Sequence, residues 1–376
     1  MGFFYSGGGE KVAIRQALGL RKRGHEVKVF SPIIYLDKCY PELAKVAPQR
    51  LVPHLQIPFP FRESSAILAS AILPFGMEKA ADCDVLLCHS QPSMWLGLRL
   101  NAIYGLPYVG YLHQLTTFLH PRPPNTENWN NTEFLLLNGI VGKVGKPLAR
   151  IIDKICHTQA SSLLFNSKWT GKQFNNAYGV RGQVCYPGID WQSKITTSRK
   201  DQLVIAARHL PWKRIDLAFP ILSGMKAGRP SLMVTGQKTE YTEVLRRKAA
   251  EQRVADRVTF TDYVDTSKLM ELFSESRSYI QTSVFEPFGM SIIEAQRQGT
   301  PAVVWGDAGA KETILDGETG FYAKPYDIGD FSSKLDTLYD PVQWERMSHE
   351  AERWASTFTW KAHLDLLEDT LAEARR

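Results

Sequence analysis

The sequence predicts an α/β protein with two doubly wound domains, each a parallel sheet covered by helices on both faces. Strand-like apolar runs alternate with helical patterns along the chain, which is typical of parallel strands joined by crossover helices. These runs fall into two sets, one on each side of a polar stretch. A chain of 376 residues also exceeds what a single core usually holds, so two domains are expected.

The first set of strand-like runs lies in the amino-terminal half of the chain. Each run is short and apolar, as expected for a strand that is buried on both faces. The runs are HEVKVFS (25–31), CDVLLCHS (83–90), LPYVGYLHQ (106–114) and SSLLFNS (161–167). They suffice for one domain, which we place at residues 1–190.

A polar segment, residues 188–202, is poor in large apolar residues and predicts a linker. The second set of strand-like runs begins at its end. These runs are QLVIAAR (202–208), SLMVTGQ (231–237), VTFTDYV (258–264), SYIQTS (278–283) and TPAVVWG (300–306). They predict a second domain over residues 191–350.

The last stretch, residues 351–376, is expected to form a terminal amphipathic helix. Trp360, Leu364, Leu367 and Leu371 recur at helical spacing and so fall on one face. We interpret that face as a packing surface, and we expect the helix to pack back on the amino-terminal domain.

Composition narrows the class of protein. The five cysteines are scattered and never spaced as CxxC, which favours reduced thiols in a cytoplasm and argues against a zinc site. The sequence contains no run of about 18 uncharged apolar residues, so a membrane span is not expected. The start, MGFFYSGGGE, lacks the pattern of a signal peptide. The net charge of +6 suits anionic partners such as phosphates or lipid headgroups, or solubility alone. Lys and Arg are spread along the chain, so nucleic-acid binding is not expected.

The segment SVFEPFGMSIIEAQRQG, residues 283–299, carries the first candidate site. Glu286 stands where an N-cap belongs, Pro287 suits the first helical position, and Gly299 suits the residue past the end. These features predict a helix over 287–298 that begins directly after a strand. Ligands of open α/β sheets bind at the carboxyl ends of the strands, so this helix start is a candidate binding site.

Two kinds of group at this predicted helix suit a polar ligand. The backbone N–H groups of Phe288, Gly289 and Met290 have no partner in a first helical turn and, with the helix dipole, attract hydroxyls or phosphate oxygens. Glu294 returns to the same face about 10 Å further along the axis. With Glu286 it suits an elongated ligand held at two points. The alternative is that Glu294 is a solvated helix residue.

A basic pair follows the strand QLVIAAR. Arg208 and Lys213 lie five residues apart in ARHLPWKR, a turn-like stretch that contains Pro211. A guanidinium acts as a planar fork and an ammonium as a point charge, so the pair suits a diphosphate. The alternative is a solvated basic loop.

These segments together resemble the retaining glycosyltransferases of family 4, which have the GT-B fold and include lipid-linked mannosyltransferases. EPFGMSIIEA is similar to the family's E-x7-E motif, ARHLPWK to its Arg-x4-Lys phosphate grip, and GDAGAKETILDGETGFYA (306–323) to its Gly-rich segment. In the first half, the similar segments are GGGEKVAIRQALGLRKRGHEVKVF (7–30), YLHQ (111–114) and LLFNSKWTGKQF…YGV…CYPGID (163–190). The resemblance covers nearly the whole chain. It implies two Rossmann-like domains that face each other across a cleft.

The resemblance implies roles for the residues of the second half. Glu286 would contact sugar hydroxyls together with the amides of the following turn, and Glu294 would bind the ribose hydroxyls. Arg208 and Lys213 would hold the diphosphate and neutralise the charge that develops as it leaves. The base would be read by backbone atoms near TDYV, which ends at Val264.

In the first half, the resemblance implies that His113 sits beside the transferred sugar, with a capping or core-edge histidine as the alternative. Gly7 and Gly8 would let the backbone come close to phosphate or acceptor, which a residue without Cβ allows.

The implied activity is the retaining transfer of a hexose from a nucleotide-diphosphate sugar to a lipid-linked or glycan acceptor. GDP-mannose is favoured as the donor, with a UDP-sugar as the alternative. The leaving phosphate is implied to help take the acceptor's proton, and neither a metal ion nor another cofactor is expected. The competing hypotheses are a nucleotide-sugar epimerase or hydrolase of the same fold, and an inactive nucleotide-sugar-binding protein.

The sequence departs from the family pattern at two places. Only MGFFYS precedes the Gly-Gly loop, so the first strand of the amino-terminal sheet is expected to be largely absent. The Gly-rich segment reads DAGAKE where two adjacent glycines are common, which gives Gly309 and Glu312 less weight as site residues. His89 and the DCD string at 82–84 are interpreted as structural.

Residues 132–155 combine apolar residues with several Lys and Arg. The neighbouring segments FPFRESSAILASAILPFG (59–76) and FLHPRPP (118–124) add apolar and basic character. Such a region suits a lipid acceptor that is reached from an anionic membrane surface, so peripheral membrane binding is expected. A core helix with a solvated basic face is the alternative.

Overall fold

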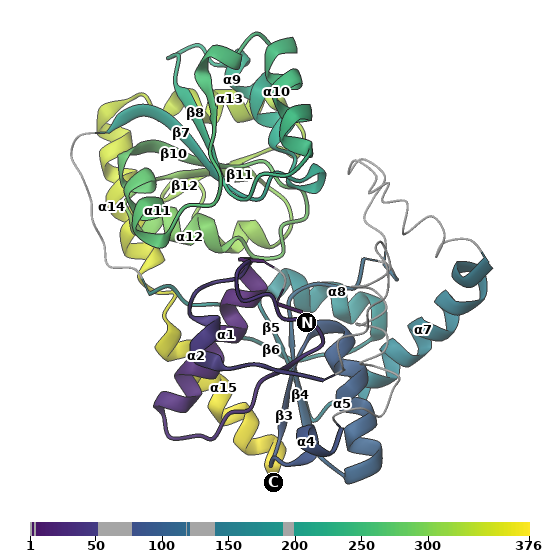
Figure 1. Cartoon of the computed structure of the whole chain (residues 1–376). Helices are drawn as coiled ribbons and strands as arrows, with labels where there is room; N and C mark the ends of the chain where they lie inside the picture. The colour runs from purple at the N-terminus through teal and green to yellow at the C-terminus, as the bar shows by residue number, and fades with distance from the viewer. Residues whose placement is uncertain (1, 4, 52–76, 118, 121–139, 191–198) are drawn as a thin grey trace. The chain divides into compact units, whose positions relative to one another are not determined.

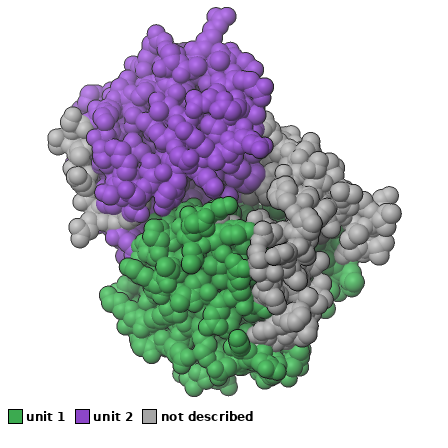
Figure 2. All heavy atoms as spheres, viewed as in Figure 1, with its two compact units in different colours: residues 1–122, 130–188, 360–376 green, residues 123–129, 189–359 purple. Residues whose placement is uncertain are grey.

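The computed structural model describes residues 2–3, 5–51, 77–117, 119–120, 140–190 and 199–376 (Figure 1). The chain forms two compact units, shown in different colours in Figure 2. Of the described residues, unit 1 holds those up to 120, those from 140 to 188, and Trp360–Arg376, and unit 2 holds the rest of Ile189–Thr359. Each unit is an α/β domain with its own parallel sheet.

Unit 2 contains a parallel sheet of six strands in the order β12-β11-β10-β7-β8-β9. The bounds are β7 (Lys200–Ala206), β8 (Ser231–Thr235), β9 (Val258–Phe260), β10 (Ser276–Gln281), β11 (Ala302–Trp305) and β12 (Gly320–Ala323). The five predicted runs of this half are confirmed as β7 to β11. β12 was not predicted as a strand and lies inside the Gly-rich segment.

Helices cover both faces of the sheet in unit 2 (Figure 1). They are α9 (Ala218–Gly224), α10 (Tyr241–Glu251), α11 (Thr266–Glu275), α12 (Met290–Arg297), α13 (Ile328–Thr337) and α14 (Pro341–Ala355). Successive residues of β7 point to opposite faces: Leu203 and Ile205 pack with residues of α9, α10 and α13, whereas Val204 packs with residues of α11 and α12. Because both faces are buried, the strands read as continuous apolar runs.

Unit 1 contains a parallel sheet of four strands in the order β3-β4-β5-β6 and a separate parallel pair, β1-β2. The bounds are β1 (Phe30–Ser31), β2 (Gln49–Arg50), β3 (Leu86–His89), β4 (Tyr108–Leu112), β5 (Ser162–Phe165) and β6 (Gln183–Val184). Three predicted runs are confirmed as β3, β4 and β5. The predicted strand 25–31 shortens to β1, because in the described residues only β2 pairs with it.

The helices of unit 1 flank its strands (Figure 1). They are α1 (Gly8–Lys22), α2 (Leu43–Val46), α4 (Met77–Ala81), α5 (Ser90–Tyr104), α7 (Ile140–Thr158), α8 (Lys168–Tyr178) and α15 (Trp360–Arg375). Ahead of α1, the described residues contain only an isolated parallel bridge between Phe3 and Ile34.

The carboxyl-terminal segment differs from the predicted single helix over 351–376. α14 ends at Ala355 in unit 2, and α15 begins at Trp360 in unit 1. In α15 the buried side chains include Trp360, Leu364 and Leu367, whereas Leu371 is half-buried. Gly19 of α1 lies so close that a Cβ there would be 2.4 Å from Leu364 Cδ1. The predicted apolar face of α15 therefore packs on α1.

The predicted linker, residues 188–202, is shorter than expected. The boundary between the units falls at Gly188 and Ile189, and β7 already begins at Lys200. Residues 191–198 lie outside the described part of the chain.

Arg199, directly before β7, links segments at the amino-terminal edge of the unit 2 sheet through hydrogen bonds. Burial lowers the pKa of its guanidinium to about 10, and no carboxylate in the described residues pairs with it. Instead it donates hydrogen bonds of 2.6–3.1 Å to Phe273 O, Ser276 O, Gln298 O, Gly299 O and Thr300 Oγ1. Several of these carbonyls close the carboxyl ends of α11 and α12, where a helix dipole favours a cation. Arg199 thereby anchors the far end of α12.

We predict that Arg199→Met lowers the free energy of unfolding by about 3 kcal/mol, because several buried carbonyls lose their donor. The control is Lys200→Met, since the neighbouring Lys200 is exposed and makes a surface ion pair with Glu275 that is worth about 0–1 kcal/mol. Chemical denaturation of both variants measures the difference. Equal stability of the two variants would contradict this role of Arg199.

Candidate active site

The candidate site of unit 2 lies where β7 and β10 end. These two strands are neighbours at the centre of the sheet, and they run parallel, so their carboxyl ends meet at one edge. The loop after β7 carries Arg208 and Lys213, and the loop after β10 carries Glu286.

The loop after β7 is held by backbone contacts with the chain that follows β8. Ala207 N donates to Thr235 O at 2.9 Å and His209 N donates to Gln237 O at 3.0 Å, so the backbone on both sides of Arg208 is fixed. A short 3₁₀ helix, Pro211–Lys213, follows. The predicted turn-like stretch is therefore an ordered loop that ends at Lys213.

The structure brings Lys213 and Glu286 into direct contact. Lys213 Nζ lies 2.8 Å from Glu286 Oε2, and their side chains are 24% and 15% exposed. Gln281 Nε2, at the end of β10, donates to the same oxygen at 3.0 Å. The cation expected at a diphosphate and the carboxylate expected at a sugar thus form one partly buried group.

The helix of the 283–299 segment starts later than predicted. α12 begins at Met290, after Gly289 in the left-handed conformation with φ 97°, so the assignment of Glu286 as N-cap and Pro287 as first helical residue is wrong. The Glu286 carboxylate accepts from Lys213 and Gln281, and the left-handed conformation of Gly289 sets the start of the helix three residues later. The predicted end is confirmed, because Gly299 follows α12 with φ 67°.

The other candidates on this segment lie in or beside α12. Phe288 is buried and packs its ring on Phe358 at 5.8 Å, while Met290 opens the helix. Glu294 is 6% exposed, so its interpretation as a solvated residue is wrong.

Gly309, which was expected to matter less as a site residue, holds the Glu286 loop in place. Its N–H donates to Glu286 O at 2.9 Å, and a Cβ at this position would be 1.8 Å from Pro287 O. The preceding Ala308 has φ 51° and ψ −156°, near a region that glycine populates almost alone. Ala308 adopts this conformation although it carries a side chain.

Sequence reasoning missed three residues around Glu286. Gln281 and Tyr279 are buried polar residues of β10, and the only sequence signal was a glutamine in an apolar run. Asp307 interacts electrostatically with Glu286, and burial raises the pKa of its carboxyl.

Val264 lies in the loop between β9 and α11, at the same edge of the sheet as the other unit 2 candidates. The Asp262 carboxylate shapes this loop by accepting from the backbone N–H groups of Lys238 and Tyr263 at 3.3 and 2.7 Å.

The candidates of unit 1 lie at α1 and β4. Gly7 is the N-cap of α1, and Gly8 opens the helix. His113 directly follows β4, and its Nε2 lies 3.2 Å from Nδ1 of His89. Burial lowers the pKa of His113 to about 3 and that of His89 well below its ordinary value. Both rings are therefore neutral at pH 7, and His89, which was interpreted as structural, contacts His113 directly.

Unit 1 also holds a buried cluster of Asp153, Cys156 and His157 with metal-ligand atoms close together. The Asp153 carboxylate and His157 Nδ1 already make hydrogen bonds within the core. Asp153 accepts from Trp95 Nε1 at 2.9 Å and from the Tyr178 hydroxyl, and burial raises the pKa of the Cys156 thiol. The cluster is therefore interpreted as core hydrogen bonding, not as a metal site.

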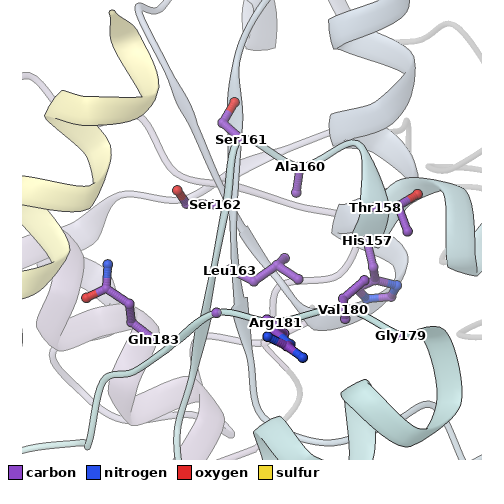
Figure 3. Close-up of a pocket in the computed structure, with 11 residues that line it drawn as sticks. His157, Thr158, Ala160, Ser161, Ser162, Leu163, Gly179, Val180, Arg181 and Gln183 are labelled. Carbon is purple, nitrogen blue, oxygen red and sulfur yellow. The ribbon is translucent and has the colours of Figure 1, made fainter.

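A cavity of about 380 Å³ lies at the amino-terminal edge of β5 in unit 1 (Figure 3). His157, Ser161, Arg181 and Gln183 are among its lining residues. His113 stands at the opposite end of the sheet, so this cavity is not part of the candidate site.

In the described part of the chain, no helix has the length and apolar character needed to cross a bilayer.

Both halves of the chain match models of glycosyltransferase families. Residues 6–192 match the model described as Glycosyltransferase Family 4, and residues 190–354 match that of Glycosyl transferases group 1. The D-inositol 3-phosphate glycosyltransferase of Mycobacterium marinum is 26% identical over 99% of this chain and 81% of its own length. The protein of the same name from Acidothermus cellulolyticus is 25% identical over 98% of this chain and 87% of its own.

Solved structures share the fold. Anabaena Alr3699/HepE, in complex with UDP and glucose, aligns with a TM-score of 0.75 at 18% identity over 99% of this chain and 98% of its own. Sucrose-phosphate synthase from Thermosynechococcus elongatus aligns with a TM-score of 0.73 at 16% identity, covering 95% of this chain and 90% of its own.

We predict that Gly309→Ala lowers the free energy of unfolding by about 2 kcal/mol, because the new methyl group overpacks the 286–288 backbone. The matched control is Gly329→Ala in α13, where a Cβ has its nearest contact at 3.5 Å and is expected to be tolerated. Thermal or chemical unfolding of both variants tests this. A Gly309→Ala variant as stable as the control would show that the close approach is not a constraint.

Proposed function

The chain is a glycosyltransferase of family 4 with the GT-B fold, and we propose that it moves a hexose from a nucleotide-diphosphate sugar to a lipid-linked or glycan acceptor with retention of configuration. The observation that carries this proposal is the pair of Lys213 and Glu286 at the carboxyl edge of the unit 2 sheet. It joins a cation suited to phosphate and a carboxylate suited to hydroxyls.

Donor binding exchanges the partners of this pair. The diphosphate attracts the Lys213 ammonium together with Arg208, and the sugar hydroxyls donate to Glu286. Separating a partly buried ion pair is costly unless both groups find new partners. A nucleotide-diphosphate sugar supplies both, an anion on one side and hydroxyl donors on the other, whereas a nucleotide diphosphate without its sugar supplies only the first.

The mechanism is electrostatic. Breaking the glycosidic bond leaves an oxocarbenium-like sugar and a nucleotide diphosphate, and Arg208 and Lys213 stabilise the charge that grows on the departing oxygens. The leaving phosphate takes the acceptor's proton on the face where the new bond forms, so configuration is retained. The family resemblance implies a contact of His113 with the sugar, and the neutral ring would hydrogen-bond hydroxyls without adding positive charge.

The donor and acceptor are proposed from likeness. The family resemblance favours GDP-mannose, while Anabaena Alr3699/HepE was solved with UDP and glucose, so a UDP-sugar is an equal candidate. The curated relatives are named for transfer to D-inositol 3-phosphate, which adds a polyol phosphate to the acceptors worth testing.

A hydrolase is the second candidate function, and Asp307 favours it. This carboxyl interacts with Glu286, and burial raises its pKa, as a catalytic acid requires. Nucleotide release that is independent of any acceptor would support the hydrolase over the transferase.

We predict that Lys213→Ala lowers the rate of sugar transfer about 100-fold, because one stabilising cation at the leaving group is lost. The control is Lys226→Ala, an exposed lysine between α9 and β8 at the opposite edge of the sheet. Release of nucleotide from UDP- and GDP-sugars, with lipid and polyol phosphate acceptors, measures the rate. Turnover like that of the wild type in Lys213→Ala would refute the assigned role.

The acceptor side of the proposal rests on α7. Its described part exposes a stripe of apolar side chains, Leu148 at 59%, Ile151 at 57%, and Ile152 and Ile155 at 38% each. In the sequence of α7, the basic residues Lys146, Arg150 and Lys154 are interspersed among these apolar residues. This pattern fits a helix that lies in the interface of an anionic bilayer and gives access to a lipid acceptor. The predicted neighbour 59–76 lies outside the described residues.

We predict that the double substitution Leu148→Ser and Ile151→Ser weakens binding to vesicles containing phosphatidylglycerol at least 10-fold at low salt, since two apolar side chains no longer enter the bilayer. Val342→Ser is the control, because Val342 is 79% exposed but lies on α14 of unit 2. Vesicle co-sedimentation measures the binding. A wild-type protein that stays in solution would remove the membrane from the proposal.

A further inference from the structure

A chain of hydrogen bonds runs through the interior of unit 2 to Glu286. The hydroxyls of Ser291 and Tyr279 lie 2.7 Å apart. Tyr279 donates to Gln281 Oε1 at 2.6 Å, and Gln281 Nε2 donates to Glu286 Oε2 at 3.0 Å. The chain thus links the first turn of α12 to the carboxylate through two side chains of β10.

The donors and acceptors of these hydrogen bonds can be arranged in only one direction. A carboxylate only accepts, so the amide nitrogen of Gln281 must face Glu286 and its oxygen must face Tyr279. The Tyr279 hydroxyl then donates to that oxygen, and Ser291 donates to Tyr279. Each bond polarises the next in the same sense, towards the negative charge.

Burying these polar side chains costs free energy unless their hydrogen bonds are made. Tyr279 is 0% and Gln281 3% exposed, and an amide in the interior is unfavourable without partners. The Tyr279 ring packs edge-on against Phe273 at 5.7 Å, so the tyrosine is fixed. A leucine at position 281 would satisfy the apolar pattern of the strand. The glutamine instead delivers a donor to one oxygen of Glu286.

We propose that Gln281, held by Tyr279, is a positioning residue for recognition of the donor sugar. This inference rests on the proposed function. Glu286 Oε2 has two donors, Lys213 and Gln281, and a diphosphate competes only for the charged one. The neutral amide stays and keeps the carboxylate aimed at the sugar without neutralising it.

The two halves of the donor are therefore read by different residues. Arg208 and Lys213 bind the diphosphate, and Glu286, positioned by Gln281, binds the sugar. Loss of the amide donor is expected to weaken binding of a nucleotide sugar while leaving binding of the bare nucleotide diphosphate nearly unchanged. A residue with a purely structural role would affect both ligands alike.

The test is calorimetric titration of UDP, UDP-glucose, GDP and GDP-mannose into the full chain. Gln281→Leu removes the donor, and Gln281→Glu keeps the shape but presents an acceptor. Tyr279→Phe removes both hydrogen bonds of the tyrosine hydroxyl, the one to the amide oxygen and the one with Ser291, and leaves the amide donor to Glu286 in place. The control is Gln202→Leu, a buried glutamine at the start of β7 that donates to Ser276 Oγ.

The sugar raises the affinity of a nucleotide sugar above that of the bare nucleotide diphosphate. For the nucleotide that the wild type binds, we expect both Gln281 variants to lower this gain about 10-fold, as for the loss of a hydrogen bond to a charged group. Tyr279→Phe should lose less of this sugar-dependent affinity, and Gln202→Leu should lose none of it. Binding of UDP or GDP alone should change less than 2-fold.

Unchanged sugar affinity in Gln281→Leu and Gln281→Glu would overturn the inference while leaving the proposed function intact. Equal losses for nucleotide and nucleotide sugar would overturn it as well, because the role would then be structural. A wild-type protein that binds none of the four ligands would refute the proposed function itself.

Discussion

The ion pair of Lys213 and Glu286 is the interaction on which the site of unit 2 depends. It ties the loop after β7 to the loop after β10 at a distance of 2.8 Å. In a partly buried setting such a pair holds its geometry because each charge is stabilised by the other. It also keeps together two groups with different chemical preferences, one for phosphate and one for hydroxyls. Under the proposed function, a ligand that carries both phosphate and hydroxyls exchanges the partners of this pair.

Backbone contacts give this pair its position. Gly309 binds the carbonyl of Glu286 and leaves no room for a side chain beside Pro287. The helix that follows is fixed at both ends, by Gly289 in the left-handed conformation at its start and by Arg199 at its last carbonyls. Changes far from the ligand can therefore alter the site, because they move a rigid element.

Much of the fold was predictable because buried parallel strands leave continuous apolar runs. Five runs of the second half became β7 to β11, and the basic pair and Glu286 fell at one edge by strand polarity alone. The start of α12 was mispredicted because the carboxylate of Glu286 serves tertiary partners instead of a cap. Gly309 received little weight and Gln281 was missed for a similar reason, since a single sequence does not show which backbone approaches a glycine or which charge a buried amide meets. In the segment between α14 and α15, Phe358 packs on Phe288, a tertiary contact that the sequence pattern does not show.

We propose that a bound donor draws Lys213 away from Glu286 while the hydrogen bond from Gln281 to Glu286 stays. A crystal structure with a bound nucleotide-diphosphate sugar measures this most directly. In such a crystal, we expect Lys213 Nζ at a phosphate oxygen, sugar hydroxyls at Glu286, and the hydrogen bond from Gln281 to Glu286 intact. A donor bound elsewhere, or one bound here with the ion pair of Lys213 and Glu286 unbroken, would contradict it.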